Sequence, residues 1–369
     1  MSNNLAIIGA SYLQLPLIEK AKEMGYITHV FAWAANDVGE TAANHFYPIS
    51  IVEKEAILDK CREIDICGIC SIASDLATIT VNYVANRLGL PCNTPKATIL
   101  STNKHLMREA FERNGDPSPK SILVDNNTNL SSLTLDYPVI VKPTDRSGSR
   151  GIYKVDNGTD LSAAVSNAIA VSFEKKALIE EFAEGQEYSV ECISFHGEHH
   201  MLAITLKYTT GAPRFIETGH REPAPIDSRT SAKIQKMVYH ALDTLGIENS
   251  ASHTELKIAP DQTIKFIEIG GRMGGDCIGT DLVRYSTGYD YVRMVIQVAC
   301  GLAPDFTHVC MPIPVQSVFL LSQKDVEALE TLKQHNPKCL IKIVDYHPEN
   351  IGKTTDSSNR AGCYIRIAE

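Results

Sequence analysis

Residues 253–275 read HTELKIAPDQTIKFIEIGGRMGG, which is two alternating runs joined by a turn and followed by a glycine-rich loop. Apolar and polar residues alternate in both runs with the two-residue period of a half-buried strand. The apolar set is Leu256, Ile258, Ile267 and Ile269. Residues 260–263 carry a turn signal, so the segment predicts a β-hairpin whose apolar face fits a core. A two-residue loop at Asp261-Gln262 would place Glu255 directly opposite Glu268.

Glu255 and Glu268 would then share one face of the hairpin, with Cβ atoms about 4.5–5.5 Å apart. Two carboxylates at that separation repel each other unless one is protonated or a cation lies between them. Mg²⁺ takes carboxylate oxygens and commonly fills its remaining positions with substrate phosphates and water. The pair therefore predicts half of a Mg²⁺ site. The alternative is a solvated pair on an exposed face.

The composition is that of a globular protein with two or three subdomains: 369 residues, 44% hydrophobic and 21% charged. The net charge of −9 and the lack of a basic stripe argue against a nucleic-acid partner. No apolar run approaches the roughly 18–20 residues of a membrane span, and the first residues lack the basic start of a signal peptide. Ten scattered cysteines indicate reduced thiols, so we expect a cytoplasmic protein without a membrane partner.

The first ~95 residues alternate between strand and helix patterns, which predicts an α/β fold with an open parallel sheet. Strands are expected at residues 5–8, 27–33 and 66–72, and helices at residues 13–24, 54–63 and 76–88. The first turn, Gly9-Ala10-Ser11, lacks a full G-x-G-x-x-G pattern, so dinucleotide binding has weak support. We expect a structural or substrate-facing role for this lobe.

The middle of the chain mixes helices and strands after a linker at residues 91–95. Helices are expected at residues 96–114, 161–173, 231–245 and 289–300. Strands are expected at residues 121–124, 138–142, 177–182, 187–195 and 201–208, before the hairpin quoted above.

A polar loop at residues 144–151 follows Lys142, the last residue of an apolar strand. Its backbone N–H groups, together with the lysine ammonium, suit contact with a phosphate group. Lys104, in the second turn of its expected helix, could add a further cation. Taken singly, each lysine is more often a solvated surface group. The connection after residue 182 could expose a backbone C=O and N–H to an adenine edge, with an acid nearby for ribose.

Together, these pieces resemble the ATP-grasp superfamily in order and spacing over roughly residues 96–305. The matching elements are Lys104, Val139 to Pro143, the Ser/Gly loop, Ile179 to Glu187, Glu255, and Glu268 to Arg272. The stretches at 215–224 and 268–276 look most like carboxylate–amine ligases, the group that contains amino-acid and dipeptide ligases. The resemblance implies a pre-ATP-grasp domain at 1–95, an ATP-grasp domain at 96–305 with a lid at about 117–183, and a C-terminal extension at 306–369 packing on it.

The resemblance also implies roles for the matched residues. Lys104 and Lys142 would hold ATP phosphates under a lid that includes Ser147, Gly148 and Ser149. The adenine hinge would be Glu180, Glu181, Phe182 and Ala183, and Glu187 would bind ribose. Glu255 and Glu268 would bind Mg²⁺, which Mn²⁺ could replace, although Gly270 stands where many relatives carry an Asn ligand. Arg272 and Lys142 would be catalytic, and the residues that contact the substrates would be Glu217, His220, Arg272 and Gly275.

The implied reaction is amide or peptide-bond formation from a small-molecule carboxylate and amine, through an acyl-phosphate, with release of ADP and phosphate. Other ATP-grasp chemistries remain as alternatives, such as carbamoyl-phosphate formation or a purine-pathway formyl or carboxyl transfer. A non-catalytic nucleotide-binding module and a structural protein are further alternatives. His220 could equally be an ordinary residue of a surface loop. The sequence does not fix the oligomeric state, although members of this group often form homodimers and a homodimer is possible here.

Overall fold

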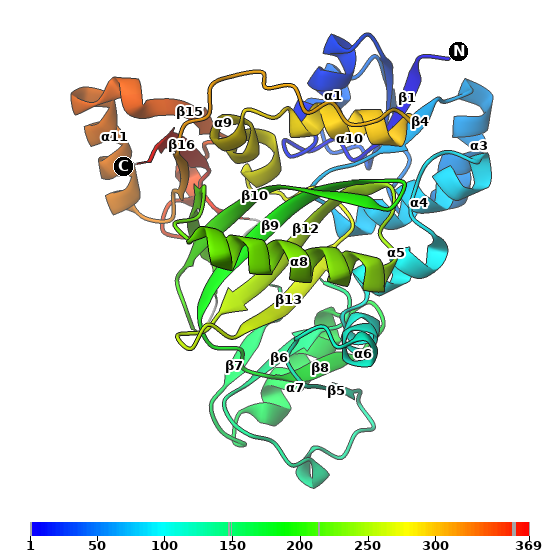
Figure 1. Cartoon of the computed structure of the whole chain (residues 1–369). Coiled ribbons are helices and arrows are strands. Elements are labelled where there is room, and N and C mark those ends of the chain that lie inside the picture. Colours follow the sequence, from blue (N-terminus) through cyan, green and yellow to red (C-terminus); the bar gives the residue numbers. More distant parts are fainter. Residues whose placement is uncertain (1, 147, 149, 213–214, 356–358, 369) are drawn as a thin grey trace.

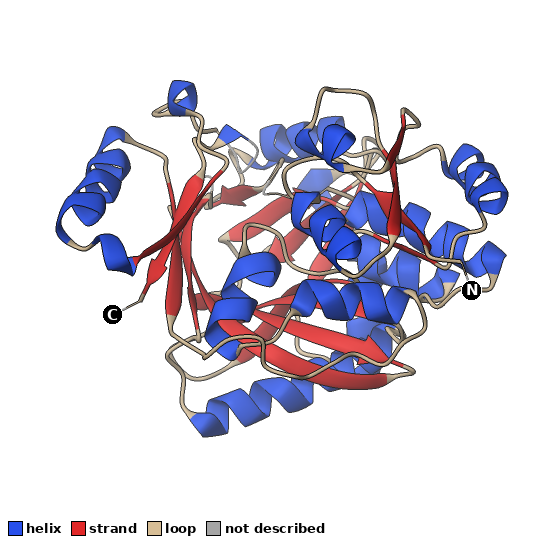
Figure 2. Cartoon of the chain, turned by 90° about the horizontal axis from the view of Figure 1, so that it is seen from above, coloured by secondary structure: helices blue, strands red, loops and turns tan. Residues whose placement is uncertain are grey.

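The computed structural model describes residues 2–146, 148, 150–212, 215–355 and 359–368. Figure 1 shows the N-terminal lobe (blue to cyan), a small sheet at the bottom, a large central sheet, and C-terminal strands at the upper left. Figure 2, seen from above, places the two chain termini at opposite sides of the molecule. No helix in the described ranges is long and apolar enough to cross a membrane.

The N-terminal lobe contains a four-stranded sheet in the order β3-β2-β1-β4, with every pair parallel. Its strands are β1 (Asn4–Ile8), β2 (Ile27–Phe31), β3 (His45–Tyr47) and β4 (Gly68–Cys70). Its helices are α1 (Leu15–Glu23), α2 (Val38–Ala42), α3 (Lys54–Ile64) and α4 (Asp75–Leu88). The predicted parallel sheet is confirmed. The short elements β3 and α2 were not predicted, because three to five residues hold too little of a period.

The small sheet at the bottom of Figure 1 has the order β5-β8-β6-β7. Its strands are β5 (Ser121–Val124), β6 (Val139–Pro143), β7 (Tyr153–Val155) and β8 (Ala177–Glu181), covered by α7 (Leu161–Val171). These elements lie within the segment where the lid was expected.

The central sheet has eight strands in the order β13-β12-β9-β10-β11-β14-β16-β15. They are β9 (Gln186–Phe195), β10 (Glu198–Thr209), β11 (Glu217–Glu222), β12 (Ser250–Ile258), β13 (Ile264–Gly270), β14 (Val315–Phe319), β15 (Leu340–Val344) and β16 (Cys363–Ile367). The C-terminal strands are thus hydrogen-bonded into the same sheet through β11 and β14. Helix α8 (Ser228–Leu245) packs on one face, and α10 (Tyr291–Ala299) packs between the other face and the N-terminal lobe. Other helical elements are η1 (Leu130–Ser132), η2 (Ile278–Leu282), α9 (Val283–Thr287), α11 (Gln323–His335), η3 (Pro337–Cys339) and η4 (Pro348–Asn350).

The single helix expected at residues 96–114 is wrong, because the segment forms α5 (Pro95–Thr102) and α6 (Lys104–Asn114). Asn103 between them has an extended backbone, and its side chain accepts from the N–H groups of His105 and Leu106. It is therefore a helix N-cap. Lys104 is the first residue of α6 rather than part of a second turn, and its N–H donates to the Thr144 carbonyl at 2.9 Å. The cap thus places Lys104 against the strand end of the small sheet.

The β12–β13 hairpin pairs Glu255 with Glu268 as predicted, although its turn differs from the prediction. The Ala259 N–H donates to the Thr263 carbonyl, so three residues form the connection instead of two. A β-bulge next to Glu255 inserts one extra residue, Ile267, and this restores the carboxylate pairing. The bulge also removes Ile267 from the expected core face. Phe266 occupies that face instead and is fully buried.

Candidate active site

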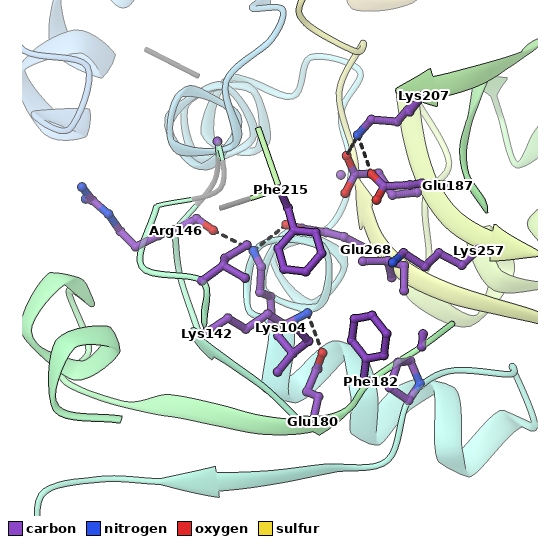
Figure 3. Close-up of a pocket in the computed structure, with 18 of the residues that line it drawn as sticks. Lys104, Lys142, Arg146, Glu180, Phe182, Glu187, Lys207, Phe215, Lys257 and Glu268 are labelled. Atoms are coloured by element: carbon purple, nitrogen blue, oxygen red, sulfur yellow. Dashed lines mark hydrogen bonds and ion pairs between the residues drawn. The ribbon is translucent and has the colours of Figure 1, made fainter. Parts of the chain in front are cut away.

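A cavity lies between the small sheet and the central sheet, and Figure 3 shows charged side chains from both converging on it. It collects most of the residues predicted for the site: Lys104, Lys142, Gly148, Glu180, Glu181, Phe182, Ala183, Glu187, Glu217, Glu255, Glu268 and Arg272. Ser147 and Ser149 lie outside the described residues. His220 and Gly275 do not line this cavity.

Lys142 and Glu180 form a buried ion pair at the bottom of the cavity, with Nζ and Oε2 2.7 Å apart. The Nε of Arg108, on α6, lies 2.9 Å from the other oxygen of Glu180. Burial favours the neutral acid, but the two cations hold the pKa of Glu180 below its usual range. The Glu180 side chain therefore orients Lys142, and any contact to adenine at this position would come from the backbone. Sequence patterns did not reveal Arg108, because one arginine on a helix has no spacing signal.

Lys104 links the loop after β6 to the hairpin. Its Nζ donates to Oε1 of Glu268 at 2.6 Å and to the carbonyl of Arg146 at 2.8 Å. The ammonium group thus lies between one of the two paired carboxylates and the loop that was expected to contact phosphate.

Lys207, on β10, is a second cation that the sequence patterns did not reveal. Its Nζ lies 2.5 Å from Glu255 and 2.9 Å from Glu187, and 3.7 Å from an oxygen of Glu217. Its side chain is only 3% exposed. The signal in the sequence was a lysine directly after the largely apolar run of residues 202–206, where a solvated lysine would be out of place.

His253 links Glu255 to the buried carboxylate of Glu191. His253 Nδ1 bonds to Glu191, and its Nε2 lies 3.5 Å from Glu255. Burial opposes protonation, yet the carboxylate of Glu191 raises the pKa of His253 to about 9. The other Glu191 oxygen accepts the Gly274 N–H at 2.9 Å, so Glu191 joins the hairpin to the glycine-rich loop.

The carboxylates of Glu255 and Glu268 fit a Mg²⁺ ion that also takes phosphate oxygens as ligands. Burial raises the pKa of Glu255, but the charge of Lys207 outweighs burial and holds this pKa well below its usual range. The Glu255 carboxylate is therefore ionised. Each of the two carboxylates is also paired with a lysine that lines the cavity. Within the described ranges, no group of three or more His, Cys, Asp or Glu side chains could hold a metal on its own. Phosphate oxygens and water would therefore complete the shell.

Arg272 faces the same cavity from the glycine-rich loop and forms a two-bond ion pair with Asp75, the first residue of α4. Asp75 belongs to the N-terminal lobe, and nothing in the sequence suggested that it approaches the loop. The pair also explains Gly270. A Cβ atom at this position would lie 2.8 Å from Oδ1 of Asp75, so a larger side chain would displace the pair.

His220 is fully buried in β11, so the alternative of a surface loop is wrong. It pairs across the sheet with Lys207, and its ring packs edge-on against Phe319. Burial lowers the pKa of His220 to about 3, which keeps the ring neutral. Neither ring nitrogen has a hydrogen-bond partner within the described part of the chain. Gly275 instead lines a second cavity, next to the N-terminal lobe.

Comparison with known proteins connects this geometry to one family. Residues 135–281 match the model of the ATP-grasp domain. The alanine–anticapsin ligase of Bacillus subtilis (strain 168) is 28% identical over 58% of this chain and 50% of its own length. Carnosine synthase 1 of Mus musculus is 24% identical over 81% of this chain and 40% of its own. The chain spans 50–63% of the alanine–anticapsin ligases that it matches.

Solved structures extend the likeness to the whole fold. An L-amino acid ligase from Bacillus licheniformis superposes with a TM-score of 0.82 and 25% identity, over 98% of this chain and 92% of that one. The ADP complex of the N5-carboxyaminoimidazole ribonucleotide synthetase purK shares the fold, with a TM-score of 0.79 and 19% identity over 99% and 92% of the two chains. The matched domain and the shared fold show that the chain contains an ATP-grasp domain, and its curated relatives are ligases.

Proposed function

We propose that this protein is an ATP-dependent carboxylate–amine ligase that forms an amide or peptide bond and releases ADP and phosphate. One observation carries the proposal: Lys104, Lys142, Lys207 and Arg272 converge on the paired carboxylates of Glu255 and Glu268 in one cavity. Nucleotide binding alone would not need four cations around a carboxylate pair. A cytoplasmic location and small-molecule substrates are part of the proposal.

The adenosine would bind at the end of the cavity formed by residues 180–183. Phe182 and Phe215 face each other there, with ring centroids 6.5 Å apart, and the Lys257 ammonium lies 5.2 Å from the Phe182 ring centre. Backbone groups of the connection after β8 would read the adenine edge. Glu187, the second residue of strand β9, would accept hydrogen bonds from the ribose hydroxyls.

The phosphates would replace the present partners of two lysines. Lys104 and Lys207 now neutralise Glu268 and Glu255. Glu255 and Glu268 would hold Mg²⁺, which would neutralise their charge in place of the two lysines. Both ammonium groups could then turn to phosphate oxygens, while Glu187, which Lys207 also contacts, would bind ribose. Lys142, fixed by Glu180, would add a third cation that needs no rearrangement.

In the proposed reaction, an oxygen of the substrate carboxylate attacks the γ-phosphorus and the bond to the β-phosphate oxygen breaks, which releases ADP. The substrate amine, which must first lose a proton, then attacks the acyl carbon, and the bond to the phosphate oxygen breaks. The protein would act by positioning and by neutralising charge. Arg272, held by Asp75, would stabilise the transferred phosphoryl group and then the oxyanion of the second step.

A phosphate-release screen over pairs of amino acids with MgATP tests this proposal. We expect ADP and phosphate to appear in equal amounts, only when both a carboxylate and an amine substrate are present. Phosphate release that requires bicarbonate with ammonia, or a ribonucleotide, would favour the other ATP-grasp chemistries. ATP binding without release of phosphate under any combination would favour a non-catalytic module.

A further inference from the structure

Two partly exposed thiols lie at the joint where the N-terminal lobe packs on helix α10. Cys67 directly precedes β4, and Cys300 is the C-cap residue of α10. Strand and helix are neighbours in Figure 1. Gly68, the first residue of β4, packs closely on the helix end, because a Cβ atom there would lie 2.8 Å from Sγ of Cys300 and from the Ala299 carbonyl oxygen. The Cys300 thiol therefore lies against the chain next to Cys67.

Cys67 also begins a C-x-x-C motif that ends at Cys70, but these two cysteines cannot be bonded to each other. Three residues of extended chain separate their Cα atoms by about 10 Å, and a disulfide requires less than about 7 Å. Burial also raises the pKa of Cys70 to about 12, so its thiol stays protonated. The partner that fits Cys67 is Cys300, which is distant in sequence.

The Cys67 thiol is the more reactive of the pair. A hydrogen bond from Cys300 lowers the pKa of Cys67 to about 7, although burial and the charge of Asp65 act against it. The same hydrogen bond raises the pKa of Cys300, which also bonds to the Tyr26 hydroxyl, so Cys300 keeps its proton. A partly exposed thiolate beside a protonated thiol is the arrangement of redox-sensing cysteines.

We propose that hydrogen peroxide converts Cys67 and Cys300 into a reversible disulfide, and that this bond lowers the turnover of the ligase. The effect on turnover rests on the proposed function, whereas formation of the bond does not. The Cys67 thiolate attacks a peroxide oxygen, and the O–O bond breaks to leave a sulfenic acid and hydroxide. The Cys300 sulfur then attacks the sulfenic sulfur, and the S–O bond breaks. The two thiols lose two electrons, and the peroxide and the thiol protons become two molecules of water.

Strand β4 connects this joint to the active site. The loop after the strand contacts the glycine-rich loop, because the Ala73 N–H donates to the Met273 carbonyl at 3.2 Å. The following helix begins with Asp75, which holds Arg272. The disulfide would draw the start of β4 onto α10. Since Gly68 already lies tight against that helix, the strand must shift, and both contacts transmit the shift to the glycine-rich loop.

Peroxide treatment of the reduced protein tests formation of the bond without any substrate. Mass spectrometry should show the loss of two hydrogen atoms and a peptide pair that links Cys67 to Cys300, and dithiothreitol should reverse both. The rate should rise about tenfold from pH 6 to pH 8, as Cys67 becomes thiolate. Absence of this linkage from the wild-type protein, or a rate independent of pH, would overturn the inference whether or not any variant folds.

Two variants separate the two steps of the oxidation. Cys300→Ser should stop at the sulfenic acid on Cys67, which a dimedone probe captures, and Cys67→Ser should give neither product. Cys310→Ser is the matched control, because Cys310 is also partly exposed but its thiol donates to the Arg284 carbonyl. This control should form the linkage as the wild type does, and its loss there as well would contradict a specific pair.

Turnover tests the regulatory part of the proposal. With substrates that give ADP and phosphate, kcat of the oxidised wild-type enzyme should be about 3- to 10-fold lower than that of the reduced enzyme, and dithiothreitol should restore it. The same treatment should leave kcat of Cys67→Ser unchanged. A linked enzyme with the kcat of the reduced enzyme would refute the regulation. If no pair of substrates gives ADP and phosphate, the ligase function fails, and the mass measurement still decides whether the disulfide forms.

Discussion

Arg272 in the glycine-rich loop is held by Asp75 in the N-terminal lobe through two hydrogen bonds, Nε–Oδ1 at 2.8 Å and Nη2–Oδ2 at 3.1 Å. Both side chains are largely buried, at 15% and 17% exposure. A Cβ at Gly270 would lie 2.8 Å from the Asp75 carboxylate and 3.3 Å from Nε of Arg272. Gly270, where the family resemblance implies an Asn, therefore leaves room for a fixed guanidinium.

Gly270→Asn should consequently impair the enzyme instead of adding a metal ligand. The new side chain would displace Asp75 and release Arg272 from its fixed orientation. We expect kcat to fall by about 10- to 100-fold, with a smaller change in the KM for ATP, because the contact of Arg272 would strengthen in the transition state. Asp75→Asn should give the same pattern, and Asp59→Asn, in a surface pair with Arg62, should not. A rise in activity or in Mg²⁺ affinity for Gly270→Asn would contradict this account.

Glu268→Gln tests the proposed metal pair. The amide keeps the shape of the side chain but removes the charge that Mg²⁺ requires, so most turnover should be lost while the thermal unfolding temperature stays near that of the wild type. Steady-state phosphate release and differential scanning calorimetry measure the two effects. Glu330→Gln, which removes a charge from an exposed helical pair with Lys333, is the control. Activity within about threefold of the wild type would refute the assignment.

The sequence revealed those parts of the site that are local in the chain. The carboxylate pair could be predicted because Glu255 and Glu268 belong to one hairpin, where the alternation and a turn set the register. The prediction succeeded even though the turn length was wrong, since the bulge at Ile267 compensates for the extra turn residue. Lys142 and residues 180–183, which line the cavity, were likewise marked in the sequence by strand ends and a connecting loop.

The partners of these residues could not be predicted, because each comes from a distant element. Lys207 lines the cavity from β10, while Asp75 on α4 and Arg108 on α6 pair with lining residues from outside it. Single charged residues on such elements have no pattern of their own. His220 is the opposite case. Its neighbours in sequence suggested a loop, yet tertiary packing against Phe319 places it in a buried strand.

Glu222 should make the stability of the fold depend on pH. Burial raises the pKa of Glu222 to about 7, although Thr205 and Ser286 donate hydrogen bonds to it. The folded state therefore binds this proton more tightly than the unfolded state does. Its stabilising contribution is complete below the unfolded pKa of about 4.5 and is lost as the pH rises through about 7.

Glu222→Gln should abolish that dependence, because the amide stays neutral at every pH. Relative to the wild type, the variant should gain roughly 2–3 kcal/mol in the free energy of unfolding between pH 5 and pH 8. Urea unfolding at pH 5, 6, 7 and 8 measures the difference. Glu330→Gln should show no such trend, and parallel curves for Glu222→Gln and the wild type would show that Glu222 ionises normally.

The loop at residues 144–151 should be protected from amide exchange when nucleotide binds. Lys104 already donates to the carbonyl of Arg146 in this loop, and Arg146 and Gly148 line the cavity. Closing of such segments over phosphates is common in enzymes of this kind of chemistry. Hydrogen exchange with and without MgATP, using a non-hydrolysable analogue, measures the effect. Residues 323–335 on α11, none of which lines the cavity, provide the internal reference. Equal exchange across the loop in both states would argue against a lid.

The route of the substrate oxygen distinguishes an acyl-phosphate from an acyl-adenylate. If the carboxylate attacks the γ-phosphate, its oxygen becomes the bridge between the acyl carbon and phosphorus. The amine then breaks the bond on the carbon side, so ¹⁸O from a labelled carboxylate should appear in the released phosphate, with ADP as the nucleotide product. An adenylating enzyme would instead transfer the label to AMP and release pyrophosphate. The first outcome is expected because Lys104, Lys207 and Arg272 surround the carboxylate pair at which the β- and γ-phosphates would lie, where charge develops during γ-transfer. Labelled AMP would overturn the mechanism while leaving the fold and the family unchanged.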